Sequence, residues 1–150
     1  MRRAVAFLLG CLAAAAHANP AARPQRDINA LAGSWNGSHI EQRRSCRSVQ
    51  NEGFHGTYAD YGIYVDTVGH ALIINETAVT GLTCTWSGQY RDDAGRTVIS
   101  GSLSCSDGRA GTFQSEGFFV LATLMSLRLS IQLSGSETCT VDAILSGAHF

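Results

Sequence analysis

The sequence predicts an all-β fold, a single small antiparallel barrel or closed meander of about eight strands, stabilised by disulfides. Three observations predict it. Apolar and polar residues alternate strictly from Met125 to Ser134, as in a strand with one buried and one solvated face. No proline follows Ala30, whereas glycine, serine, threonine and valine recur between short apolar runs. Once Cys11 of the leader is set aside, an even number of cysteines remains, which predicts two disulfides.

Residues 1–18 are expected to form a signal peptide. Arg2 and Arg3 precede an apolar run, and the small residues around His17 suit cleavage before Asn19. The apolar run is shorter than the roughly 20 residues that span a bilayer. Residues 19–29 hold both prolines and are expected to form a flexible lead-in, which leaves residues 30–150 for the barrel domain. The predicted location is therefore the periplasm or the extracellular space.

A second interpretation of the N-terminus is a lipoprotein anchor. The stretch "LLGC" resembles a lipobox, in which Cys11 would carry the lipid. More apolar sequence follows Cys11 where a polar tether is expected, so ordinary cleavage is favoured. All eleven basic residues are arginine, which together with abundant alanine and glycine indicates GC-rich, bacterial coding.

Each expected strand is a short run with partial or full alternation, bounded by turn residues. The stretch from Gly117 to Met125 lacks turn residues, so a bend, a short helix and one long strand that changes partner all remain open. The expected strands are residues 32–42, 56–66, 70–79, 83–90, 96–105, 111–119, 124–134 and 138–145.

Residues 83–105 predict a hairpin that a disulfide closes. If the chain turns around residues 93–96, Cys84 faces Cys105, Trp86 faces Leu103 and Gly88 faces Gly101. A shift of one residue would place this face against serine and threonine, which register resists. Cysteines directly opposite one another on neighbouring strands lie within the range of a disulfide. The glycine pair is expected to leave some open space inside the barrel.

Two further pairings follow from this hairpin. Asp107-Gly108 predicts the next turn, and a bulge at Gly108 would bring Leu103 opposite Phe113. Cys46 and Cys139 are then left to pair, which would tie the two ends of the meander together. Four cysteines allow three connectivities, of which this one is favoured.

Short motifs resemble those of small up-and-down barrels of the calycin type. Gly33-x-Trp35 in "LAGSWNG" is similar to the G-x-W of lipocalins and avidins, and "GTY", "TWSGQY" and "LSGAHF" resemble stretches of avidins. The resemblance implies a barrel fold, without biotin binding, because only Trp35 and Trp86 are present where avidins have several tryptophans. In lipocalin-like barrels a late arginine packs on the first-strand tryptophan. Arg128 is the candidate, although its strand pattern places it equally well in solvent.

Neither catalysis nor nucleic-acid binding is predicted. Acids and histidines are scattered without a nucleophile motif or paired carboxylates, so we expect a non-enzyme with no cofactor. The cysteine and histidine spacings fit no zinc site, and no metal is expected. The formal net charge of −1 lacks the strongly basic face of a nucleic-acid binder.

The candidate binding residues fall into two groups. Arg43, Arg44, Phe54 and His55 flank or lie in one long connection, where an arginine-rich rim could engage an anion or a protein. Inside the barrel, Trp35, Trp86 and Tyr61 are the candidates for lining a small-ligand pocket. Tyr58, Tyr61 and Tyr64 alternate along one strand and must therefore divide between its two faces.

The predicted function is that of an exported, non-catalytic binding module with an unknown partner. In one version the core is solid and the arginine-rich loop binds a protein, as an inhibitor does. The alternative is a small-ligand-binding barrel of the lipocalin or avidin kind, whose ligand is small and apolar. The bulky alternating residues of 125–133 favour the solid core. A second alternative is a small outer-membrane barrel, which the alternation also permits. Membrane attachment is expected only in that case or if Cys11 is lipidated.

Overall fold

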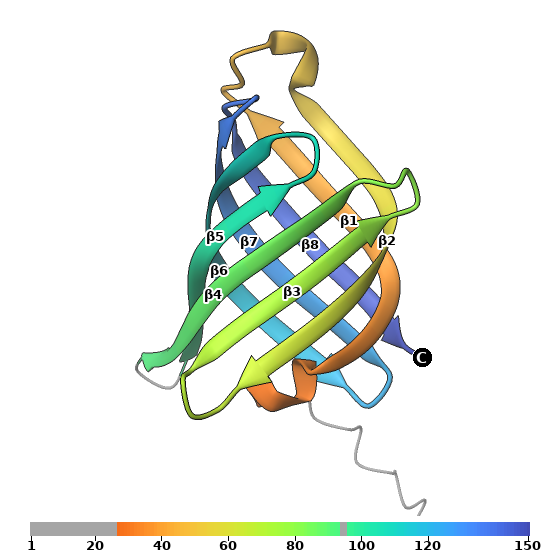
Figure 1. The fold of residues 1–150 in the computed structure, drawn as a ribbon, viewed down its shortest axis with the longest axis vertical. Helices are drawn as coiled ribbons and strands as arrows, with labels where there is room; N and C mark the ends of the chain where they lie inside the picture. Colours follow the sequence, from red (N-terminus) through yellow and green to blue (C-terminus); the bar gives the residue numbers. More distant parts are fainter. Residues whose placement is uncertain (1–26, 94–95) are drawn as a thin grey trace, which may run out of the picture.

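The computed structural model describes residues 27–93 and 96–150 and forms a closed antiparallel barrel of eight strands (Figure 1). Each strand pairs with its neighbours in chain order, and the last strand closes the ring onto the first.

The predicted all-β, closed architecture is confirmed. The expected signal peptide, Cys11 and residues 19–26 lie outside the described residues. The strands are β1 (Gly33–Arg44), β2 (Gly53–Asp66), β3 (Ala71–Ala78), β4 (Thr83–Asp93), β5 (Arg96–Cys105), β6 (Arg109–Leu121), β7 (Leu124–Gly135) and β8 (Thr140–His149).

Alternation along the strands places the apolar residues inside the barrel. In β7, Met125, Leu127, Leu129 and Ile131 are each at most 2% exposed, and the serines and Arg128 between them face outward. β8 adds Val141, Ala143 and Leu145 to the same interior in the same way. The period of two read from the sequence therefore sets which face is buried.

One end of the barrel is closed by the 3-10 helix η1 (Ile28–Leu31). Ile28 and Leu31 are buried, and the indole Nε1 of Trp35 donates a hydrogen bond to the carbonyl of Leu31 at 2.9 Å. Residues 28 and 29, which were expected in the flexible lead-in, belong to η1, where Ile28 is buried and Asn29 is exposed. The ring of His149 packs edge-on against Trp35, with centroids 4.8 Å apart.

Arg128 does not pack on Trp35. Its side chain is 63% exposed and forms an ion pair with Glu116 of β6 at 3.0 Å. The strand phase decides this, since Arg128 lies between the inward-facing Leu127 and Leu129.

Both expected disulfides are present at the end of the barrel opposite η1. Cys84 and Cys105 face each other across β4 and β5, with Cα atoms 4.0 Å apart. Cys46, just after β1, joins Cys139, just before β8, with Cα atoms 4.2 Å apart. The cross-links indicate an oxidising, extracytoplasmic environment.

The register of β4 and β5 matches the prediction, but that of β5 and β6 does not. Leu103 lies opposite Gly111, and Phe113 lies opposite Gly101. The small Gly101 and Gly88 make room for the ring of Phe113, which therefore does not need Leu103 opposite it. A Cβ on Gly88 would lie 2.9 Å from Phe113 Cζ, so this ring fills the space expected to be open.

A tight turn at residues 122–123 settles how residues 117–125 are folded. β6 and β7 are separate strands that pair from Arg109 with Gly135 to Leu121 with Leu124. A register shift between Ser115 and Gly117 marks a bulge in β6. Ser115 points inward in alternation with Phe113, and its hydroxyl accepts a hydrogen bond from the backbone N–H of Ile99 at 2.8 Å. Beyond the bulge the inward positions change, so that Val120 is buried.

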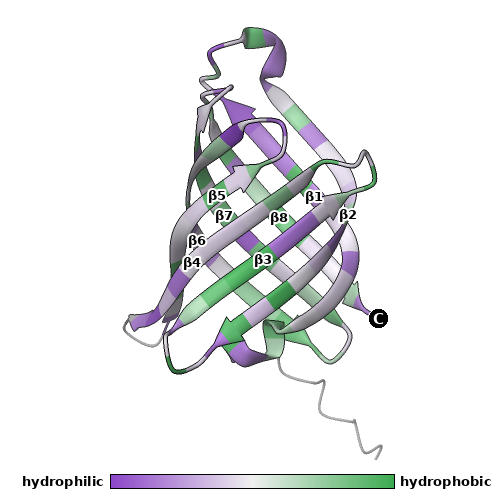
Figure 2. Ribbon diagram, in the orientation of Figure 1, coloured by the Kyte–Doolittle hydropathy of each residue, from purple (hydrophilic) through white to green (hydrophobic). Residues whose placement is uncertain are grey.

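Hydropathy differs between the two ends of the barrel. Figure 2 shows hydrophobic residues gathered on the part of β3 near η1 and hydrophilic ones on its opposite part. Outward-facing positions of β4, β5 and β7 are mostly serine, threonine, glutamine and arginine. Among residues 27–93 and 96–150, no helix combines the length and the apolar character needed to cross a bilayer.

Candidate binding site at the open end of the barrel

A cavity of about 210 Å³ opens at the end opposite η1. The connections at residues 45–52, 79–82, 106–108 and 136–139 surround this end. Both disulfides also lie there, so the strand ends around the cavity are tied at two places. The apolar part of the cavity wall includes Ala78, Leu82, Leu103, Ile131, Leu133 and the Cys84–Cys105 disulfide.

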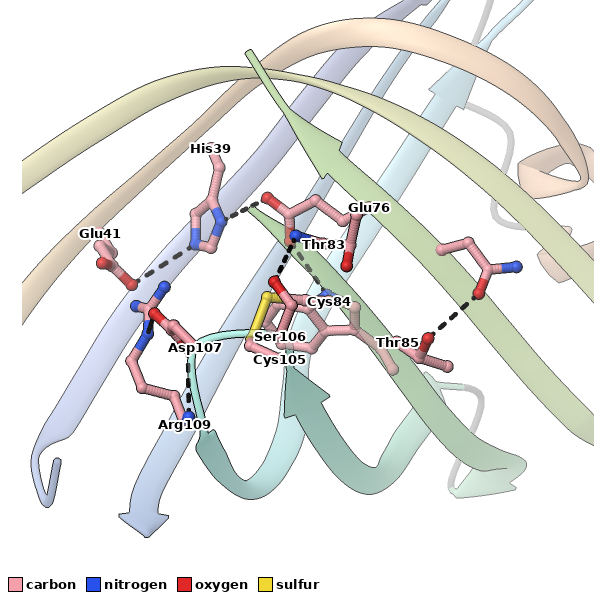
Figure 3. Close-up of a disulfide and its surroundings, with 12 residues drawn as sticks. His39, Glu41, Glu76, Thr83, Cys84, Thr85, Cys105, Ser106, Asp107 and Arg109 are labelled. Carbon is pink, nitrogen blue, oxygen red and sulfur yellow. Dashed lines mark hydrogen bonds and ion pairs between the residues drawn. A yellow bond between two sulfur atoms is a disulfide. The ribbon is translucent and has the colours of Figure 1, made fainter. Parts of the chain in front are cut away.

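A buried polar group reaches across the barrel to form part of this wall. Glu76 of β3 is 4% exposed, and its Oε2 accepts a hydrogen bond from Trp86 Nε1 at 3.0 Å. Its Oε1 lies 2.8 Å from Nδ1 of His39 on β1 (Figure 3). Three strands thus meet through one carboxylate, whose two oxygens are both hydrogen-bonded. Such pairing is what allows a carboxylate to remain inside a core.

A second ion pair continues this group along β1 toward the open end. Glu41 is 8% exposed, and its Oε1 accepts hydrogen bonds from Nε and Nη2 of Arg43. Its Oε2 lies 3.6 Å from His39 Nε2, too far for a hydrogen bond, so that buried nitrogen has no hydrogen-bond partner in the described structure. Because His39, Glu41 and Arg43 are two residues apart, all three point inward from one strand.

Arg109 brings a further positive charge to the cavity from β6. Its Nε donates to Asp107 Oδ2 at 2.7 Å, and its side chain is only 16% exposed. In Figure 3 the Arg109 side chain points toward the group formed by His39 and Glu41. Partial burial pushes the pKa of Asp107 up, but hydrogen bonds from the backbone and side chain of Arg109 outweigh it. The pKa of Asp107 therefore lies below its ordinary value.

Tyr61 lies opposite Glu76 on the neighbouring strand and is 1% exposed. Its hydroxyl has no hydrogen-bond partner within the described residues. Burial, and then the charge of Glu76, raise the pKa of Tyr61 well above its ordinary value, so the phenol stays neutral. Tyr61 is not part of the cavity wall.

The candidate residues chosen from sequence separate into three places. Trp86, Arg43 and His55 line the cavity. Trp35 and Tyr61 are buried inside the barrel but do not line the cavity, and Trp35 packs at the η1 end. Arg44 and Phe54 face outward, where Arg44 pairs with Asp142 and Phe54 is 77% exposed.

Two details of the predicted arginine-rich loop are wrong. Phe54 and His55 belong to β2 rather than to a loop, and the connection before them is residues 45–52, with the short helix η2 (Val49–Asn51). Arg43 is not a solvated rim residue, because it shares the inward phase of Trp35 and pairs with Glu41.

The residues that sequence reasoning missed are His39, Glu41, Glu76 and Arg109. The alternation in β3 does indicate Glu76, because this residue falls on the same inward-facing side of the strand as Leu72 and Ile74. His39 and Glu41 likewise share the phase of Trp35 in β1. Charged residues at positions reserved for the core point to a buried polar group.

One other cluster could suggest a metal site. Among the described residues, Cys46, Glu137 and Cys139 bring potential ligand atoms within 4.8 Å of one another. Both sulfurs are bonded to each other in the disulfide, which removes the thiolates that would bind a metal.

Comparisons with known proteins give no family. No protein-family model matches the chain, and no curated protein matches it. Among solved structures, the barrel is similar to a protein of unknown function from the DUF3598 family of Nostoc punctiforme. The match has a TM-score of 0.45 and 13% identity, and it covers 85% of this chain and 51% of that one. The chain thus spans about half the length of that protein, and the likeness bears on neither ligand nor partner.

Proposed function

We propose that this protein is an exported, non-catalytic binding module whose barrel holds a small ligand in the cavity at its open end. The cavity of about 210 Å³, with its apolar wall and polar inner group, is the observation that carries the proposal. Ligand sites commonly combine mostly apolar walls with a few fixed polar groups. The volume lies below the roughly 300–1,000 Å³ of pockets for drug-sized ligands, so the ligand is correspondingly small.

The shape of the interior supports this choice over a completely solid core. Near η1 the barrel is filled by Trp35, Leu72 and Leu127, each at most 1% exposed. Toward the other end apolar side chains such as Leu82 and Ile131 alternate with charged ones such as Glu41 and Arg109, and they leave a cavity between them. A ligand would therefore rest its apolar part against Leu82 and Leu103 and reach the polar group beside Trp86.

The protein-binding alternative keeps one supporting observation. Phe54 is 77% exposed at the start of β2, next to the connection 45–52, where Val49 is 75% exposed. A partner protein could cover these two side chains without using the cavity. The outer-membrane alternative has less support, because the outward faces of β4, β5 and β7 lack the apolar band that lipid requires.

Native mass spectrometry of protein purified from its own host tests the proposal. We expect an added mass that survives gentle desolvation and leaves on denaturation. Leu82→Trp, which adds bulk inside the cavity, should lower its occupancy. Val79→Trp is the matched control, because Val79 is 76% exposed and does not line the cavity. Equal occupancy in both variants, or no added mass in any preparation, would refute the proposal.

The same preparations test the protein-binding alternative. Phe54→Ser together with Val49→Ser should leave the small-molecule adduct unchanged if the cavity is the site. Loss of a co-purifying protein in this variant, with no adduct in the parent, would favour the exposed pair instead.

A further inference from the structure

The hydrogen-bonding groups of the cavity are unequally used. The acceptors are largely occupied, because Glu76 uses both oxygens on His39 and Trp86, and Glu41 uses Oε1 on Arg43. The donors are not. Arg109 is held through Nε alone, so its two terminal nitrogens form no hydrogen bond with the described residues.

A second guanidinium in the cavity wall is also incompletely used. Arg43 bonds Glu41 through Nε and Nη2, which leaves its other terminal nitrogen. A guanidinium carries five N–H donors in a fixed fork, and most of those at Arg43 and Arg109 remain for a ligand.

Burial makes these donors effective. The side chains of Arg43 and Arg109 are 13% and 16% exposed, so water competes less for their N–H groups than at the surface. Their partners Glu41 and Asp107 hold each guanidinium by one edge and fix its orientation. Arg44, by contrast, is 56% exposed and pairs with Asp142 outside the barrel.

We infer that the ligand of this cavity is an amphiphile with an anionic head group, a carboxylate, which binds to Arg43 and Arg109 while its apolar part lies against Leu82 and Leu103. This inference rests on the proposed function and names its ligand class. A carboxylate accepts from guanidinium forks in a bidentate manner, which suits the donors that remain. An ammonium head group would find both oxygens of Glu76 already hydrogen-bonded, and it has no acceptor to offer the remaining N–H groups of Arg43 and Arg109.

Three probes with the same eight-carbon chain and different head groups test this inference: octanoate, octan-1-ol and octylammonium. Differences in their binding report on the head group alone. Binding is measured by calorimetry and by saturation-transfer NMR at neutral pH and low salt, because screening weakens such contacts. We expect octanoate to bind at least about tenfold more tightly than octan-1-ol, and octylammonium to bind most weakly.

Arg109→Gln should remove this preference, so that octanoate and octan-1-ol bind equally to the variant. Its thermal unfolding midpoint, compared with that of the parent, shows whether the variant is folded. Arg109→Lys should keep part of the preference, since it retains the charge but not the fork. Arg44→Gln, the matched control for loss of one arginine outside the barrel, should behave as the parent.

The outcomes separate this inference from the function on which it rests. Equal binding of octanoate and octan-1-ol overturns the anionic head group and leaves the cavity as a site for apolar ligands. The anionic head group is equally overturned if Arg44→Gln weakens octanoate as much as Arg109→Gln does. If no probe binds, the carboxylate amphiphile is excluded, and the adduct found by native mass spectrometry decides the proposed function independently.

Discussion

Trp86 donates its indole N–H to Glu76 across 3.0 Å, and the two residues are 1% and 4% exposed. The carboxylate also meets His39, so one buried acid joins β1, β3 and β4. A neutral hydrogen bond of similar length, from Trp35 to the carbonyl of Leu31, occurs at the opposite end of the same barrel. The two tryptophans therefore allow a carboxylate acceptor, Glu76, to be compared with a backbone carbonyl acceptor, Leu31, in one protein.

Trp86→Phe is expected to destabilise the protein more than Trp35→Phe does. Both substitutions shorten a buried indole, but the first leaves a buried charged oxygen without its donor. Leaving a buried acceptor unsatisfied costs about 1–3 kcal/mol, and more when it is charged. Urea denaturation without reductant measures the difference. Equal losses would mean that solvent from the cavity replaces the lost donor.

The two disulfides are expected to contribute unequally. Cys46–Cys139 spans 93 residues of sequence and Cys84–Cys105 spans 21. In the chain-entropy description the longer loop restricts the unfolded chain more, giving about 4.7 against about 3.3 kcal/mol. Paired serine substitutions at each bridge avoid a stray thiol, and denaturant midpoints rank them. The reverse ranking would show that local packing beside the cavity outweighs loop length.

Gly101→Ala is expected to disrupt the pairing of β4 with β5. A Cβ there would lie 2.1 Å from the carbonyl oxygen of Ser87, a backbone atom that cannot move aside alone. Such overpacking typically costs about 1–3 kcal/mol or more. Gly62→Ala is the control, since a Cβ at that position meets nothing within 4 Å. Thermal unfolding compares the two, and a stable Gly101→Ala protein would contradict the close approach.

Acid should weaken the open end of the barrel through Glu137. The side-chain hydrogen bond from Asn51 lowers its pKa, partial burial opposes this, and the backbone N–H of Thr138 lowers it further. A pKa lowered by folding means stability that is present above the unfolded value and lost as pH falls through the folded one. Asp107 acts in the same direction.

The midpoint of unfolding, followed from neutral pH down through the carboxylate range, measures this effect. Asn51→Ala should flatten the acid limb of the profile, because the pKa of Glu137 would return toward its ordinary value. Glu116→Gln, which alters an exposed ion pair with Arg128, serves as the control and should leave that limb in place. If the acid part of the stability profile is unchanged in Asn51→Ala, the loss of stability at low pH does not come from Glu137.

The alternation of apolar residues made the barrel predictable. In β7 it identified the buried face correctly, and the opposed cysteines fixed the register of β4 and β5. The register of β5 and β6 was mispredicted because matching Leu103 with Phe113 assumed that apolar side chains face one another. Phe113 instead lies opposite Gly101, since a large ring beside a small residue fills the interior better.

The polar group of the cavity was out of reach for a different reason. His39 and Glu76 are 37 residues apart and meet only because the curved sheet brings β1 and β3 together across the interior. Strand phase shows that each points inward, but it does not show which inward residues face one another. Arg44 and Phe54 were selected for their residue type, and their outward phase places them away from the cavity.

The Cys46–Cys139 bond also has a consequence for proteolysis. It closes a covalent ring over 93 residues of sequence, which holds every strand except β1 and β8 between its two cysteines. A protease that cut any one connection inside this ring, such as the exposed Val49 region, would leave both fragments joined. All eight strands would stay attached, and the cut would become visible only after reduction. A protein exposed to secreted proteases could therefore survive a first cleavage without losing any of its strands.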